Sequence, residues 1–196
     1  EEAKKLYKEN ISIAWPSTIE GALMSIIGSV DTAMVGTLGT AAIAGVGLTS
    51  QPRMILLVVA QALCVGTTAI CARRKGANDQ KGANACLNQS MAIITLLGLL
   101  MTLAGYFGAE WLMKLAGANE DTLEISVSYF KIISLGLLFN CWSLCICAAM
   151  RAIGKTRITM VTNITANLVN VCLNYVLING KLGFPRLGVR GAAIAT

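Results

Sequence analysis

Residues 85–107 read ACLNQSMAIITLLGLLMTLAGYF, and no charged side chain interrupts them. A transmembrane α-helix needs about 20 predominantly apolar residues, so this stretch is long enough to cross a bilayer. Four further apolar segments of comparable length lie along the chain, and a sixth begins at Gly191. The five complete segments cover about Ile11–Leu38, Ala42–Ala72, Ala85–Phe107, Ile125–Met150 and Ile158–Ile178. The sequence therefore predicts an all-α polytopic membrane protein with five complete spans and the start of a sixth.

The composition also indicates a lipid environment. Hydrophobic residues make up 55% of the 196 residues and charged residues only 13%, whereas about a quarter of an average soluble domain is charged. The first apolar segment is too long for the apolar core of a signal peptide, so we expect a retained helix.

The seven cysteines all lie in or beside the apolar segments. They form no C-x-x-C pair, and the chain has no histidine to complete a zinc site. We interpret them as small packing residues and expect no metal centre or cofactor. Serine-nucleophile and phosphate-loop motifs are also absent from the sequence, so we do not expect an enzyme.

Basic residues are distributed unevenly between the loops. If the N-terminus is cytoplasmic, ten basic residues lie inside and four outside, in accord with the positive-inside rule. The inside set is Lys4, Lys5, Lys8, Arg73, Arg74, Lys75, Lys81, Arg151, Lys155 and Arg157, and the outside set is Lys114, Lys181, Arg186 and Arg190. We therefore interpret the net charge of +6 as a topology signal of a multi-pass cell-membrane protein. We expect no nucleic-acid partner.

Asp31 lies inside the first span, about two turns from its outer end, in the sequence GSVDTAMVG of residues 28–36. An ionisable side chain there costs on the order of 2.5 kcal/mol or more by insertion scales, so it usually faces a cavity and has a partner. The alternative is an acid that snorkels to the membrane interface. A functional role is favoured by the polar residues of the fifth span.

In the fifth span, four asparagines recur with helical spacing. Asn163, Asn167, Asn170 and Asn174 lie within about 60° of one another on a helix and form one polar stripe. Asn170 and Asn174 are expected at the depth of Asp31. Carboxylate and amide oxygens suit a hard cation such as sodium, and the carboxylate can instead take up a proton. The structural alternative is that the asparagines only form hydrogen bonds between helices.

Four other residues in or near the spans are open to interpretation. Pro16 either bends the first span or occupies its first turn. Glu20, a second acid in that span, either faces the substrate path or pairs with another helix. Arg53 and Lys131 are read as side chains that snorkel to an interface.

Several stretches resemble bacterial transporters of the multidrug and toxic compound extrusion (MATE) family, in the family's order along nearly the whole chain. They are Trp15–Glu20 and Val30–Gly36 in the first span; Gly66–Ala69, Ala72–Arg73 and Gly76–Ala77; Met150–Thr156; and Asn174–Ile178, Gly180–Pro185 and Leu187–Thr196. The resemblance implies a twelve-helix transporter of two six-helix lobes, of which this chain is the N-terminal lobe and the C-terminal lobe is absent.

The resemblance further implies secondary active efflux of amphiphilic, often cationic compounds in antiport with protons or sodium, in a membrane protein that we expect to be bacterial. In one branch of the family the cation site uses a first-span aspartate, fifth-span polar residues and a sixth-span threonine. These correspond here to Asp31, Asn170, Asn174 and Thr196, and the proline whose bending is linked to that aspartate corresponds to Pro16. Some relatives carry aspartate at the position of Asn174, which leaves the choice between sodium and protons open.

A flippase of lipid-linked precursors on a related architecture is the alternative function. It would need basic residues lining the central cavity to hold a phosphate head group, whereas most basic residues here lie in loops. The expected partners are therefore amphiphilic small molecules, membrane lipid and the C-terminal lobe of the same protein.

Overall fold

The computed structural model describes residues 2–180 and 185–196, without the side chains of residues 2–13, 16 and 17. These residues form helices and contain no strand. The helices are α1 (Glu2–Gly36), α2 (Thr40–Gly76), α3 (Gln80–Phe107), α4 (Ala109–Leu115), α5 (Glu120–Ala152), α6 (Thr156–Asn179) and α7 (Val189–Ala195). The expected role of Pro16 in bending the first span falls on a side chain outside this description.

Local sequence sets where several helices begin and end. Asp79 begins α3 by accepting a hydrogen bond from the Gly82 amide at 2.8 Å, as an N-cap does. Asn119 and Thr122 form a reciprocal capping box at the start of α5. Gly180 ends α6 in the left-handed conformation, with a φ of 67°, which glycine adopts without steric cost.

Five of the helices are long and apolar enough to cross a membrane: α1 from Thr18, α2, α3, α5 and α6. Four of them contain their predicted apolar segment, whereas the first segment, Ile11–Leu38, runs two residues beyond the end of α1 at Gly36. The short helix α4 joins α3 to α5, and α7 begins in the segment that follows Gly188.

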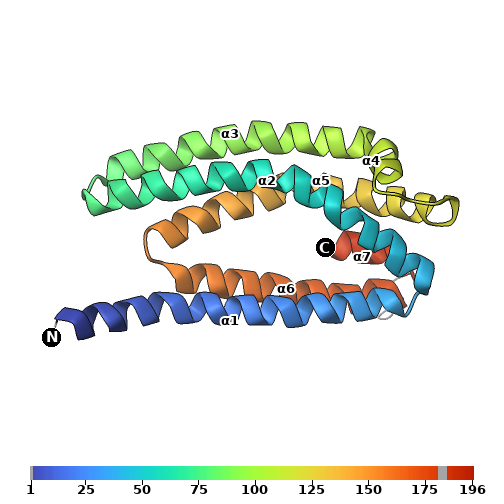
Figure 1. Ribbon diagram of the computed structural model, residues 1–196, viewed down its shortest axis with the longest axis horizontal. Coiled ribbons are helices and arrows are strands. Elements are labelled where there is room, and N and C mark those ends of the chain that lie inside the picture. Colours follow the sequence, from blue (N-terminus) through green and yellow to red (C-terminus); the bar gives the residue numbers. More distant parts are fainter. Residues whose placement is uncertain (1, 181–184) are drawn as a thin grey trace.

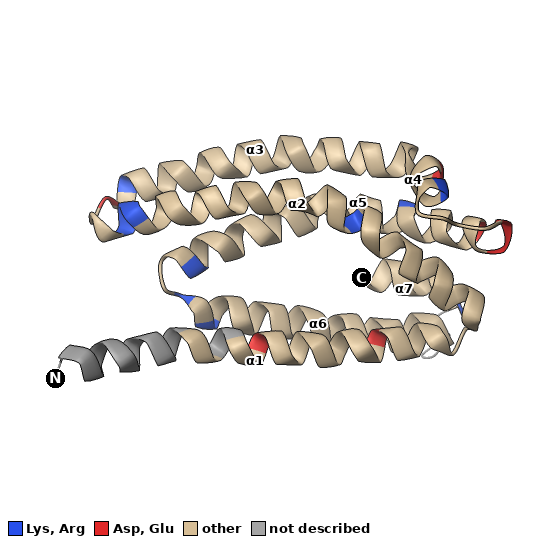
Figure 2. Cartoon of the chain, in the orientation of Figure 1, with Lys and Arg blue, Asp and Glu red and all other residues tan. Residues whose placement is uncertain are grey.

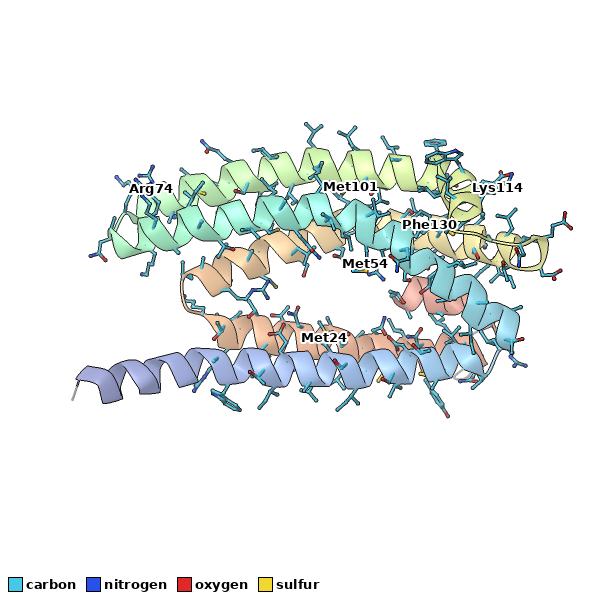
Figure 3. All side chains as sticks on the ribbon, in the orientation of Figure 1. Met24, Met54, Arg74, Met101, Lys114 and Phe130 are labelled. Carbon is cyan, nitrogen blue, oxygen red and sulfur yellow. The ribbon has the colours of Figure 1, made fainter. Side chains whose placement is uncertain are left out.

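The helices form two layers (Figure 1). Helices α2, α3 and α5 pack on one another in the first layer, and α1 pairs with α6 in the second. The short helix α7 lies between the layers and contacts both α5 and α6. Arg74 and Lys114 mark the opposite ends of the first layer (Figure 3).

Two hydrophobic clusters explain how the layers are joined. The first holds Val35 of α1, Phe130 of α5 and Ile178 of α6, with residues of α2, α4 and α7, so it ties both layers together at the end where α1 turns into α2. The second, centred on Ile94 and Cys141, contains residues of α2, α3 and α5 only. The layers are therefore fastened at the α1–α2 end, while the opposite, α2–α3 end has no shared core among these clusters.

Candidate functional site

The asparagine stripe of α6 faces α1. Asn163 Nδ2 donates a hydrogen bond to Glu20 Oε1, and Asn174 Nδ2 donates to Asp31 Oδ1 at 2.9 Å. Asn167 Nδ2 donates to the Met24 sulfur at 3.0 Å and also to the Asn163 carbonyl oxygen at 2.8 Å. Met24 points from α1 toward α6 (Figure 3). Three of the four asparagines thus pair with α1.

These three pairs share one register. In each, the two partners are 143 residues apart in the sequence, as expected for two parallel helices that lie side by side. Asn170 breaks this register, because its Nδ2 donates to the Ala195 carbonyl oxygen of α7 at 2.8 Å. The stripe therefore connects α6 to both α1 and α7.

Asp31, Asn170 and Asn174 form one hydrogen-bonded cluster. The Asn174 amide nitrogen donates both to Asp31 and to Asn170 Oδ1, the latter at 3.1 Å. Asn174 is buried, with 2% of its surface exposed, and its Oδ1 atom has no hydrogen-bond partner among the described residues. A buried acceptor without a donor is costly, so this oxygen is a candidate ligand.

Thr196 lies next to this cluster but is not hydrogen-bonded to Asp31. Its hydroxyl donates to the Ala192 carbonyl oxygen at 2.9 Å, and it lines the same cavity as Asp31 and Asn170. Tyr129, a buried residue of α5, lies beside Thr196. Tyr129 carries no periodic or compositional signal, and sequence reasoning missed it.

A cavity of about 540 Å³ separates the two layers. Two acids of α1, Glu20 and Asp31, line it together with Asn163, Asn167 and Asn170 of α6. The opposite wall is formed by α2 and α5. That wall contributes Arg53, Asn140, Ser143, Leu144, Cys147 and Arg151, and Ala195 and Thr196 also line the cavity.

A second cavity of about 320 Å³ lies beside the first. It is lined mainly by apolar residues of α5, among them Leu135 and Phe139. Arg53, Asn140 and Thr196 line both cavities. Sequence reasoning noticed Arg53 but read it as an interfacial side chain, because a single sequence does not show which helix faces a cavity.

The oxygen atoms gathered around Asp31 suit a small hard cation. They comprise a carboxylate, two side-chain amides and a nearby hydroxyl. The described residues hold no group of three or more His, Cys, Asp or Glu that could bind a metal ion. The donor set therefore fits a weakly held ion better than a structural metal.

A bundle of long apolar helices with a polar cavity and a carboxylate–amide cluster inside it defines a lobe of a membrane transporter. The MatE family model matches residues 16–176, which is most of the chain. The chain belongs to the MatE family. Its sequence relatives are named as transporters or drug-resistance proteins, and not as enzymes.

Curated relatives match along nearly the whole chain. The chain is 32% identical over 197 residues to "Probable multidrug resistance protein NorM" of Thermotoga maritima, covering 100% of this chain and 42% of the relative. It is 29% identical to "Multidrug resistance protein PmpM" of Pseudomonas aeruginosa, covering 96% of this chain and 40% of the relative. The chain thus spans about two fifths of the length of these relatives.

Solved structures share the fold. A MOP superfamily transporter from Pyrococcus furiosus superposes with a TM-score of 0.88 at 26% identity, covering 96% of this chain and 41% of that one. A MATE transporter solved with MaD3S gives a TM-score of 0.87 at 27% identity, over 96% and 42% of the two chains. The chain therefore has the architecture of the N-terminal half-transporter lobe.

Proposed function

We propose that this lobe, together with a second lobe, forms a secondary active multidrug exporter that moves amphiphilic, often cationic compounds in antiport with protons or sodium ions. The observation that carries the proposal is the cluster of Asp31, Asn170 and Asn174, with its one unpartnered amide oxygen, beside a cavity between the helix layers. The names of the curated relatives favour multidrug export over a lipid-precursor flippase.

The coupling step follows from the bond between α1 and α6. When Asp31 is ionised, its carboxylate accepts the Asn174 hydrogen bond. A proton or sodium ion bound to that carboxylate neutralises its charge. The bound ion also competes with the Asn174 amide for the carboxylate oxygens. The contact that joins α1 to α6 at this depth then weakens. A ligand shifts a conformational equilibrium only through its different affinity for the two states, and this change supplies such a difference.

The basic residues suggest the orientation of the lobe in the cell membrane. Arg73, Arg74 and Lys75 form the last turn of α2. We place this α2–α3 end, and with it the N-terminus, in the cytoplasm because short cytoplasmic loops carry the excess of Lys and Arg. The cavity then faces a cytoplasmic substrate, and the cation cluster lies in the outer half of the membrane.

The test is efflux of a fluorescent cationic dye from vesicles that contain the full-length protein, with the proton and sodium gradients collapsed separately. We expect Asp31→Asn to abolish gradient-dependent efflux. Glu110→Gln is a matched control, because Glu110 is an exposed acid whose ion pair among the described residues is with Lys114 at the surface. Gradient-coupled efflux that survives in Asp31→Asn would remove Asp31 from the mechanism.

A further inference from the structure

Arg53 lies deep within α2. The helix has 37 residues, so at 1.5 Å per residue it is about 55 Å long, and Arg53 stands about 20 Å from its first residue. The hydrocarbon core of a bilayer is about 30 Å thick. Arg53 lines two cavities inside the lobe, so its side chain faces the interior, whereas the sequence alone predicted that it snorkels to a membrane interface.

No described residue neutralises this charge. Arg53 forms neither an ion pair nor a hydrogen bond with any residue in the described part of the chain, and the two described ion pairs lie at the ends of the bundle. Ionisable residues inside a membrane protein normally face a cavity and have a partner. Arg53 meets the first of these conditions, because it lines both the larger and the smaller cavity.

The larger cavity has charges of opposite sign on its two walls. Its acids, Glu20 and Asp31, both come from α1, whereas its basic residues, Arg53 and Arg151, come from α2 and α5. Figure 2 shows acidic positions of α1 in one helix layer and basic positions of α2 and α5 in the other. A bound molecule therefore meets negative charge on one side and positive charge on the other.

We propose that this cavity recognises zwitterionic amphiphiles, with Arg53 binding a carboxylate of the substrate and Glu20 facing its ammonium group. The inference rests on the proposed export function and names a substrate class for it. A guanidinium forms two parallel hydrogen bonds with a carboxylate, which gives it geometric selectivity for that group. The volume of about 540 Å³ fits a drug-sized molecule.

The balance of charges distinguishes this class from others. A purely cationic substrate leaves Arg53 without a counter-charge, whereas a strongly anionic lipid head group would be repelled by Glu20 and Asp31 across the cavity. A zwitterion can place its negative group against the basic wall and its positive group against the acidic wall at the same time. The adjoining cavity, with Leu135 and Phe139, offers an apolar surface for the remainder of the molecule.

The experiment compares two xanthene dyes that differ at one group: a cationic dye with a free carboxylate, and its ethyl ester. Efflux kinetics are measured for the full-length parent, Arg53→Gln, Arg53→Lys and the control Lys131→Gln. Lys131 is a suitable control because it also lies within a span, but its amine stands 5.7 Å from the Tyr106 ring centre and it lines neither cavity.

We expect Arg53→Gln to raise the KM for the carboxylate dye about tenfold or more, because one charge-assisted pair is lost, and to leave the KM for the ester within about twofold. Arg53→Lys keeps the positive charge but lacks the planar guanidinium group. Its KM for the carboxylate dye should therefore lie between those of the parent and of Arg53→Gln. Lys131→Gln should resemble the parent with both dyes. The ester dye also reports whether each variant is folded.

Two results in the variants would overturn the inference. If Arg53→Gln impairs both dyes equally, Arg53 has a structural role or pairs with an acid of the second lobe. If it changes neither dye, Arg53 does not contact the substrate. Measurements on the parent protein distinguish the two proposals. If the parent exports only the ester, the zwitterion inference is wrong but the proposed export function is retained. If the parent shows gradient-dependent export of neither dye, both proposals are wrong.

Discussion

Asn174 Nδ2 lies 2.9 Å from Asp31 Oδ1, so the only amide of the stripe that is fully buried binds the acid nearest the α1–α2 end. An aspartate at position 174 would place a second carboxylate against Asp31. Two carboxylates at hydrogen-bonding distance repel each other unless a cation or a proton lies between them. If the cluster binds a cation as proposed, we expect the identity of residue 174 to set how strongly it does so.

We predict that Asn174→Asp lowers the sodium concentration for half-maximal efflux about tenfold, which corresponds to about 1.4 kcal/mol of added attraction. Sodium-dependent dye efflux in proteoliposomes at constant pH measures this. Asn167→Asp is the matched control, because Asn167 lies on the same stripe but contacts Met24 instead of Asp31. An unchanged sodium response in Asn174→Asp, or an equal change in Asn167→Asp, would contradict the prediction.

Glu20 and Asn163 provide the second polar bond between α1 and α6. A double-mutant cycle of Glu20→Gln and Asn163→Leu should give a coupling free energy of about 1 kcal/mol, the size typical of side-chain hydrogen bonds between membrane helices. Reversible unfolding in mixed micelles measures it. Asn179→Leu serves as the control partner, since Asn179 donates only within α6, to the Tyr175 carbonyl oxygen. Additive effects of Glu20→Gln and Asn163→Leu would show that the bond contributes nothing measurable.

The sequence predicted the five long helices because membrane spans need long apolar runs, and each of the five runs overlaps one long helix. Helical periodicity also placed the four asparagines on one face, and the structure brings Asn170 and Asn174 together with Asp31. Periodicity describes one helix at a time, however. It does not say that α2 and α5 form the opposite wall, so the place of Arg53 in the cavity and of Tyr129 beside Thr196 required the tertiary structure.

Gly191 packs closely against α6. A Cβ atom added there would lie 2.8 Å from both the carbonyl carbon and the oxygen of Leu177, which are backbone atoms that cannot move freely. We predict that Gly191→Ala lowers the free energy of unfolding by about 1–3 kcal/mol, as overpacking does. It should also weaken cation-dependent efflux, because the displaced α7 carries the Ala195 carbonyl that accepts the Asn170 hydrogen bond.

Thermal unfolding in detergent and dye efflux measure the two effects of Gly191→Ala. Gly66→Ala is the control: Gly66 also lies within a helix, and a Cβ there meets no atom within 4 Å. Alanine is the better helix former by about 0.5–1 kcal/mol, so this variant should be as stable as the parent or slightly more stable. Equal stability of the two variants would show that α7 can shift away from Leu177 without cost.

Asp79 makes the stability of the α2–α3 turn depend on pH. Its carboxylate accepts hydrogen bonds from the Gly82 amide at 2.8 Å and from Arg74 Nη1 at 2.7 Å. The Gly82 hydrogen bond, followed by the one from Arg74, lowers the pKa of Asp79 below its ordinary value. Because the folded pKa lies below the unfolded value of about 3.9, the ionised carboxylate stabilises the fold above that value, and the contribution is lost as the pH falls through the folded pKa.

We therefore predict that Asp79→Ala lowers the melting temperature in detergent at pH 7, and that its difference from the parent shrinks when both are measured near pH 3. Part of the difference should persist at acid pH, because a protonated Asp79 still has an oxygen that can accept the Gly82 hydrogen bond. Glu110→Ala is a useful comparison, since the pKa of Glu110 is also lowered, chiefly by its hydrogen bond to Lys114, yet it caps no backbone amide among the described contacts. A difference between Asp79→Ala and the parent that stays constant from pH 7 to pH 3 would show that ionisation of Asp79 does not stabilise the start of α3.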